Sequence, residues 1–166
     1  MNMEEQKEAR KKALKLLEYM DRTEKGLSDR LRQAGFSAEL SKDAIEYVKS
    51  FGYLDDHRYA VTYITGRIQD KSRQKILMEL VQKGISRQTA EHAWEEAANL
   101  LAPDEHKVLC ETITKKYPVG SELNEKEMRR LQGYLLRRGF SCTDVYSALE
   151  ELNIRLICNE TCGSYL

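Results

Sequence analysis

The sequence predicts an all-α protein built as an elongated, curved array of three tandem three-helix repeats. One glycine-centred segment occurs three times in the 166 residues. Apolar residues follow helical spacing, and no stretch shows the sustained alternation that is typical of a strand. The chain has only 2 prolines and 9 glycines, too few for the many turns of an all-β sandwich. Tandem repeats contact mainly their neighbours, which favours an extended shape.

The repeated segment is centred on a glycine, and the three glycines are 49 and 55 residues apart. An aliphatic residue stands eight positions before each glycine, and a leucine stands four positions before it. A large apolar residue and a serine follow directly, and an alanine stands nine positions after the glycine. The copies are Leu27 to Ser37 around Gly35 with Ala44, Ile76 to Ser86 around Gly84 with Ala93, and Leu131 to Ser141 around Gly139 with Ala148.

Each matched position has a local physical reason. Residues eight and four positions before the glycine share one helical face, which must be buried. A glycine just past a helix adopts the left-handed conformation without steric cost and stops the helix. The serine is a typical N-cap for the next helix. The alanine suits a close crossing of two helices. Each repeat therefore contains a short helix, a glycine stop and a further helix.

A longer helix precedes each pair. The first is expected at 3–20 and the second at 55–68. The third has Pro103 at its first helical position and ends before Pro118, and 117–124 form a loop. We therefore expect about nine helices. The residues expected to face inward are Ala9, Ala13, Leu14, Leu17, Met20, Tyr59, Ala60, Tyr63, Ile64, Ile68, Val108, Leu109, Thr112, Ile113 and Tyr117.

The predicted domain organisation follows the repeats. Repeat one covers 1–54, repeat two covers 55–102 and repeat three covers 103–153, and a tail follows at 154–166. The tail does not match the repeat. It extends the last helix, docks as an irregular strand or frays, and we favour disorder beyond about Ile157.

Charge and hydropathy limit the class of protein. The chain carries 27 basic and 27 acidic residues, which argues against binding to DNA or membranes by bulk charge alone. No apolar run approaches the roughly 18 residues that a membrane span needs. The first twelve residues are charged and lack the apolar core of a signal peptide. We therefore expect a cytoplasmic protein, a monomer with no membrane contact.

The usage of the four cysteines also favours a cytoplasmic protein. They form no CxxC pair, and Cys158 and Cys162 have no histidine near them in the sequence to complete a zinc site. Reduced thiols are the plain interpretation, so the sequence predicts neither a metal nor a cofactor.

No catalytic motif stands out. GxxxxGK[ST], GxGxxG, HExxH and GxSxG are all missing, and His57, His92 and His106 stand alone. Asp55 and Asp56 are the most enzyme-like pair, but adjacent helical residues point about 100° apart. We expect Asp55 to be an N-cap and Asp56 to oppose the helix dipole. The sequence therefore favours a binding protein over an enzyme.

Basic residues recur around the short helix of each repeat, which is consistent with one basic side of the array. A solvated face of mixed charge is the open alternative. The candidate binding residues are Arg58, Arg73, Lys75, Lys83, Arg129, Arg130, Arg137 and Arg138. Lys75 and Lys83 are expected to share one exposed face.

Three runs carry a resemblance to a known family: Phe51 to Ala60 (FGYLDDHRYA), Glu79 to Ser86 (ELVQKGIS) and Tyr134 to Phe140 (YLLRRGF). In this order they resemble the bacterial RecX family over about residues 9 to 152. The resemblance implies tandem three-helix repeats that lie in the groove of the RecA filament on single-stranded DNA. It implies a cytoplasmic modulator that inhibits strand exchange and ATP turnover.

The chain departs from the family pattern in two ways. The family carries Gly-Pro-x-[RK] before its second short helix, where this chain has Ser72 to Lys75, with Ser72 as the expected N-cap. The family is also often basic, whereas this chain is neutral, so we expect at most weak direct DNA binding. Two alternatives stay open: a stand-alone DNA-binding protein of helix-turn-helix type, for which the SRQT run at 86–89 is suited, and a helical interaction scaffold.

Overall fold

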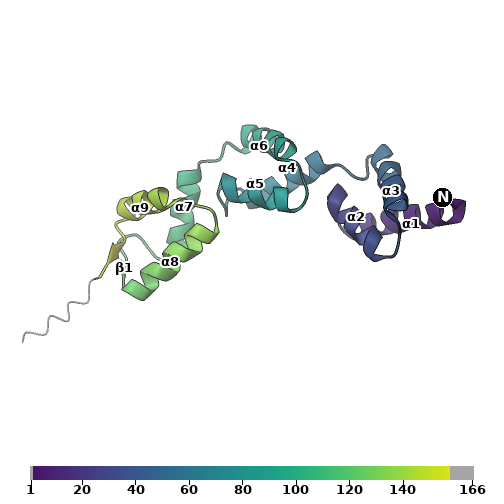
Figure 1. Cartoon of the computed structure of the whole chain (residues 1–166). Coiled ribbons are helices and arrows are strands. Elements are labelled where there is room, and N and C mark those ends of the chain that lie inside the picture. The colour runs from purple at the N-terminus through teal and green to yellow at the C-terminus, as the bar shows by residue number, and fades with distance from the viewer. Residues whose placement is uncertain (1, 158–166) are drawn as a thin grey trace, which may run out of the picture. The chain divides into compact units, whose positions relative to one another are not determined.

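The computed structural model describes residues 2–157 and is all-α within them, with nine helices and one pair of two-residue strands (Figure 1). The elements are α1 (Met3–Tyr19), α2 (Glu24–Gln33), α3 (Ala38–Ser50), α4 (Asp56–Arg67), α5 (Arg73–Gln82), α6 (Arg87–Leu101), α7 (Glu105–Thr114), β1 (Glu122–Leu123), α8 (Glu125–Arg137), α9 (Cys142–Glu151) and β2 (Arg155–Leu156). The predicted class and the three helices per repeat are confirmed. The domain boundaries and the curved outline stay predictions.

The described chain divides into two compact units. One contains the residues up to Gly66 together with Leu77–Ala102, and the other contains Arg67–Ile76 together with the residues from Pro103 on. The second unit therefore takes in the segment of repeat two that leads into α5. Each unit is described by itself below.

The repeated glycines end α2, α5 and α8. Their φ angles are 98°, 93° and 90°, which is the left-handed region that glycine tolerates best. In each case the residue after the glycine donates its backbone N–H to the leucine carbonyl five positions earlier, the closure expected of a Schellman motif. These three bonds are Phe36 to Leu31 at 3.2 Å, Ile85 to Leu80 at 3.1 Å and Phe140 to Leu135 at 3.2 Å.

The helices begin at polar caps. The side chains of Ser37, Ser86 and Ser141 each accept a hydrogen bond of 3.2 Å from the N–H three residues on, which confirms the predicted serine N-caps. One prediction is wrong: α7 begins at Glu105 with Asp104 as its N-cap, so Pro103 lies just outside the helix. The Asp104 carboxylate accepts the N–H of residue 107, which a proline ring cannot do.

Each repeat buries the stripe that its spacing predicts. In repeat one, α1 packs on α3, and the alanines Ala9, Ala13 and Ala44 are fully buried where side chains must be small. In repeat three, α7, α8 and α9 surround one apolar core. That core contains Val108, Leu109, Ile113, Leu123, Met128, Leu131, Leu135, Phe140, Val145, Ala148, Leu149 and Ile154.

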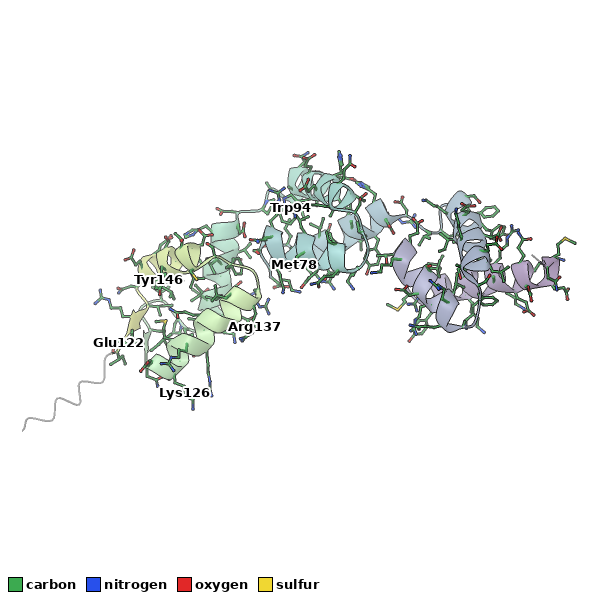
Figure 2. All side chains as sticks on the ribbon, in the orientation of Figure 1. Met78, Trp94, Glu122, Lys126, Arg137 and Tyr146 are labelled. Atoms are coloured by element: carbon green, nitrogen blue, oxygen red, sulfur yellow. The ribbon has the colours of Figure 1, made fainter. Side chains whose placement is uncertain are left out.

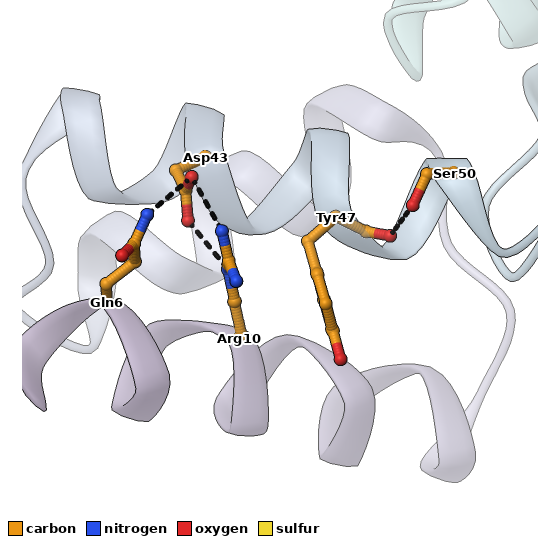
Figure 3. A network of polar contacts seen from close by, with 5 residues as sticks. All are labelled: Gln6, Arg10, Asp43, Tyr47 and Ser50. Carbon is orange, nitrogen blue, oxygen red and sulfur yellow. Dashed lines mark hydrogen bonds and ion pairs between the residues drawn. The ribbon is translucent and has the colours of Figure 1, made fainter. Parts of the chain in front are cut away.

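A polar network also holds α1 against α3 (Figure 3). Arg10 donates to both carboxylate oxygens of Asp43, at 2.9 and 3.1 Å, and Gln6 donates to the same group at 2.9 Å. The Arg10 guanidinium also lies 4.6 Å from the ring centre of Tyr47. The hydrogen bond from Arg10 lowers the pKa of Asp43 below its ordinary 3.8. Arg10 therefore has a structural role, because it holds α1 against α3.

One inward-facing prediction is wrong. Met20 is 51% exposed because α1 ends at Tyr19 and the chain turns away from helical angles. Leu14, Leu17 and Tyr117 do face inward, because they are half-buried and pack against the cores of their repeats. Tyr59 is half-buried.

The segment expected to be a loop contains β1, which pairs in parallel with β2 of the tail. Of the alternatives left open for the tail, docking as a short strand describes residues 155–156. The disorder favoured beyond Ile157 concerns 158–166, which lie outside the described residues.

Contacts between α2 and α5 join repeats one and two. The Thr23 hydroxyl, which caps α2, donates a 2.9 Å hydrogen bond to the carbonyl oxygen of Lys83 at the end of α5. At the same place the Asp56 carboxylate accepts a 2.8 Å hydrogen bond from the backbone N–H of Glu24. The first residue of α4 thus caps the first turn of another repeat's short helix.

A similar joint occurs between α5 and α8. The backbone N–H of Ser72, the cap of α5, donates a 3.1 Å hydrogen bond to the carbonyl oxygen of Arg138. Arg138 in turn donates from its guanidinium to the carbonyl oxygen of Asp70 at 2.9 Å. The carboxylate of Glu105, the first residue of α7, accepts the backbone N–H of Arg73. Both joints therefore use the start of one short helix and the end of the next repeat's short helix.

The joints also explain why two of the repeated glycines lack a side chain. A β-carbon on Gly84 would lie 2.5 Å from Cβ of Lys25, and one on Gly139 would lie 2.5 Å from Cβ of Lys75. Gly35 has nothing within 4 Å of that position. All three glycines need their backbone angle, but only those at joints also need the space.

Candidate functional site

An exposed row of basic side chains lies on α8. Lys126, Arg130 and Arg137 stand at helical positions i, i+4 and i+11, so they follow one line along the helix, and we call them the basic row. They are all exposed, and Figure 2 shows Lys126 and Arg137 at opposite ends of α8. The row is about 16 Å long at 1.5 Å per residue. Its opposite face, with Leu131 and Leu135, is buried in the core.

The N-terminal end of the basic row borders an open hollow of about 550 Å³. Asn124, Glu125, Lys126, Arg129 and Arg130 line it. Arg129 contacts Glu125 at 2.6 Å, but both side chains are about three-quarters exposed, so water screens this pair strongly. The hollow therefore offers three basic groups beside one acid.

Gly133 lies in the middle of the basic row. The Arg137 guanidinium reaches back over it, with Nη1 3.2 Å from where a β-carbon would stand. The Arg137 side chain therefore covers the backbone of α8 at Gly133.

Arg138, a predicted contact residue, also makes contacts within the fold. Its guanidinium lies 4.5 Å from the ring centre of Tyr134, and Lys116 lies 3.9 Å from the same centre. Together with its hydrogen bond to Asp70, this stacking fixes Arg138 at the joint of α5 with α8.

The three basic candidates of repeat two do not form one exposed face. Lys75 is half-buried and packs its stem against Gly139. Arg73 is exposed at the start of α5, where its N–H is bonded to Glu105. Lys83 lies beyond the end of α5, with its ammonium 5.5 Å from the ring centre of Tyr63.

Arg58 belongs to a second surface, in the first unit. Its guanidinium donates to the carbonyl oxygen of Gly52 at 3.0 Å, and it lines an open hollow of about 660 Å³. Phe51 and Tyr53 line the same hollow and are 58% and 56% exposed. Their rings stack with their centres 5.9 Å apart, and the ring of Phe51 lies edge-on to that of Tyr47 with the centres 5.1 Å apart. We call Phe51, Tyr53 and Arg58 the aromatic surface.

The acidic pair beside this surface has separate roles. Asp55 accepts the N–H of Arg58 at 3.2 Å as a helix cap. Asp56 is half-buried and bonded to Glu24, and its burial raises its pKa above the ordinary 3.8. Both groups are therefore engaged in holding the backbone.

Sequence reasoning missed Lys126, Phe51 and Tyr53 as surface candidates. Lys126 is recognisable from the i, i+4, i+11 spacing with Arg130 and Arg137, once a helix is placed at 125–137. The two aromatic residues belong to the FGYLDD run, and nothing in the sequence separates an exposed ring from a buried one there.

The comparisons with known proteins agree with the architecture. The models of the first, second and third three-helix domains of RecX match residues 9–47, 55–93 and 104–149 respectively. Within residues 2–157, no helix is both long enough and apolar enough to cross a membrane.

Several relatives are similar over most of the chain. The regulatory protein RecX of Clostridium perfringens (strain SM101 / Type A) is 31% identical over 154 residues, which cover 89% of this chain and 68% of that protein. The regulatory protein RecX of Caldanaerobacter subterraneus subsp. tengcongensis is 30% identical over 152 residues, covering 90% and 73%. The crystal structure of RecX from Lactobacillus salivarius superposes with a TM-score of 0.67 at 22% identity, covering 92% and 99%, and so shows the shared fold. The chain belongs to the RecX family.

Proposed function

We propose that this chain regulates the RecA recombinase by binding in the groove of the RecA filament on single-stranded DNA. Bound there, it slows strand exchange and ATP hydrolysis by obstruction, with no catalysis of its own. Membership of a family of regulatory proteins supports the proposal. The single observation that carries it is the exposed basic row of α8, a cationic feature on a neutral chain.

The basic row is suited to a phosphate backbone. Lys126 and Arg130 are one turn apart, and Arg137 lies about two turns further, so separate phosphates can be contacted in succession. Each neutralised phosphate releases counterions and makes the affinity depend on salt. Because the whole chain has no net charge, these contacts need help from a protein partner for tight binding.

The aromatic surface is suited to that protein partner. Exposed aromatic rings and an arginine are the residue types that dominate protein interfaces. Phe51 and Tyr53 are held by stacking, so little side-chain freedom is lost on binding. Two contacts on one chain act together through effective concentration, and modest individual affinities suffice.

The decisive experiment compares binding to RecA filaments on single-stranded DNA with binding to the same DNA bare. Preference for the filament, with slower ATP hydrolysis by RecA, supports the proposal. Equal affinity for bare DNA supports the stand-alone DNA-binding alternative, which the basic row also favours. Absence of binding to either supports the scaffold alternative.

A charge-reversal pair tests the basic row itself. Arg130→Glu with Arg137→Glu should weaken filament binding at least ~10-fold, or about 1.4 kcal/mol, and reduce the salt slope by roughly 1.4 to 1.8. Lys11→Glu with Lys12→Glu on α1 is the matched control, because both residues are exposed and the change in net charge is the same. Equal losses in the two double variants would mean that bulk charge, not the row, binds.

The aromatic surface needs a different control. Phe51→Ala with Tyr53→Ala should weaken filament binding by about 1–2 kcal/mol and leave bare-DNA binding unchanged. Tyr146→Ala on α9 removes an equally exposed ring elsewhere and should leave both unchanged. A loss on bare DNA as well would place the rings on DNA bases instead of on protein.

A further inference from the structure

A cluster of metal-ligating side chains lies in the third repeat, on α7 and α9. His106 and Cys110 stand at positions i and i+4 of α7, so they share one face of the helix. Glu151, at the end of α9, points to the same place, and its carboxylate contacts Nε2 of His106. The Cys110 sulfur lies 3.6 Å from the same nitrogen. One donor atom from each residue lies within 4.8 Å of the others.

These separations suit a tetrahedral ion. Zinc binds histidine nitrogen at about 2.0–2.1 Å and cysteine sulfur at about 2.3 Å, which places the two donors about 3.5 Å apart in a tetrahedron. The sulfur–nitrogen distance of 3.6 Å therefore needs almost no adjustment. The carboxylate is in direct contact with the histidine and must open slightly, which a side chain more than half exposed can do.

The donor set narrows the choice of ion. A thiolate, an imidazole and a carboxylate are ligands that zinc accepts together, whereas calcium and magnesium prefer oxygen alone. The negative charges of Asp104 and Asp144 also act on His106, so the surroundings favour a cation. His106 and Glu151 are exposed, which leaves room for a water or a partner's side chain as the fourth ligand.

We propose that His106, Cys110 and Glu151 form a zinc site that ties the first turn of α7 to the end of α9. Binding displaces the thiol proton of Cys110 into the buffer and leaves the imidazole neutral, so the site forms by simple exchange of a proton for the metal. The ion then holds α7 and α9 together at the surface of repeat three. This proposal departs from the sequence expectation of no metal, which rested on the missing CxxC pairs and on the lack of a histidine near Cys158 and Cys162.

The test uses the full chain with Cys142→Ser, Cys158→Ser and Cys162→Ser, so that Cys110 is the one remaining thiol. Zinc titrated against a chromogenic chelator should bind once per chain with Kd at or below ~10 μM. Cobalt(II) should give the near-ultraviolet sulfur charge-transfer band and the visible bands of a tetrahedral site. Zinc should also raise the melting temperature of this background.

Two single variants decide the assignment. Adding Cys110→Ser should abolish the sulfur band and weaken zinc binding at least ~10-fold, and Glu151→Gln should weaken it with the sulfur band retained. Glu151 is exposed, so its variant keeps the test valid even if the Cys110 variant unfolds. Zinc binding weaker than ~10 μM in the background, or unchanged by both variants, overturns the proposal.

Discussion

Replacing Gly84 by alanine should destabilise the first unit more than the same change at Gly35, because only Gly84 lies at a joint. Both glycines end a short helix with φ near 95°, so alanine costs about 1–2 kcal/mol of backbone strain at either. At Gly84 the new β-carbon would also stand 2.5 Å from Cβ of Lys25, and overpacking of this kind adds about 1–3 kcal/mol. We therefore expect a loss of about 1–2 kcal/mol at Gly35 and about 2–5 kcal/mol at Gly84.

Urea unfolding followed by circular dichroism at 222 nm measures both losses. Lys25→Gly should partly rescue Gly84→Ala, because it removes the overlapping carbon but leaves the backbone strain, and it should not rescue Gly35→Ala. If Gly35→Ala costs as much as Gly84→Ala, or if Lys25→Gly rescues both alike, the α2–α5 joint does not exist in solution.

Three further outcomes are expected. Asp56→Asn keeps an acceptor for the N–H of Glu24 and should change the free energy of unfolding by less than ~0.5 kcal/mol, whereas Asp56→Ala should cost about 1–3 kcal/mol in urea unfolding at pH 7. Arg10 lowers the pKa of Asp43 in the folded protein, so the pair stabilises the fold above the ordinary pKa of 3.8 and loses this effect as the pH falls through the lower pKa of the folded state. The difference in melting temperature between the parent and Asp43→Asn should therefore close on acidification below about pH 4. The purified chain should hydrolyse no ATP yet slow hydrolysis by assembled RecA, and ATPase activity that co-elutes with it in gel filtration would refute the non-enzymatic role.

The internal layout of a repeat was predictable because it rests on local physics. Leu27 and Leu31 share a face by helical spacing alone, and Gly35 follows where that face ends. The serine caps act over three residues of chain. Each rule relates positions within one or two helical turns, and such relations are visible in a sequence.

The joints between repeats were not predictable, because they connect residues that are far apart along the chain. Asp56 was assigned to the dipole of its own helix, but its carboxylate bonds to Glu24, 32 residues earlier. Glu105 acts in the same way on Arg73. The available signal was an acid at the first position of both α4 and α7, which a single-repeat interpretation explains equally well as a helix-dipole effect.

The same limit affected the candidate binding residues. Lys75 was expected to share an exposed face with Lys83, yet the stem of Lys75 packs on Gly139 and Lys83 turns toward Tyr63. A basic residue near a helix end serves equally well as a joint or as a contact with a partner. Only the position of the next repeat along the chain separates the two roles.

That distinction gives a physical reason to place the partner on repeat three. The first turn of α2 docks on the end of α5, and the first turn of α5 docks on the end of α8. Residues 2–157 contain no fourth repeat, so the first turn of α8 makes no such joint, and an open hollow lined by Lys126, Arg129 and Arg130 occupies this place. Within residues 2–157, the surface that joins repeats elsewhere is therefore open at the first turn of α8 and lined by basic side chains. We expect a phosphate-bearing partner to bind there with little loss of contacts within the fold, because both side chains of the Arg129–Glu125 pair are about three-quarters exposed.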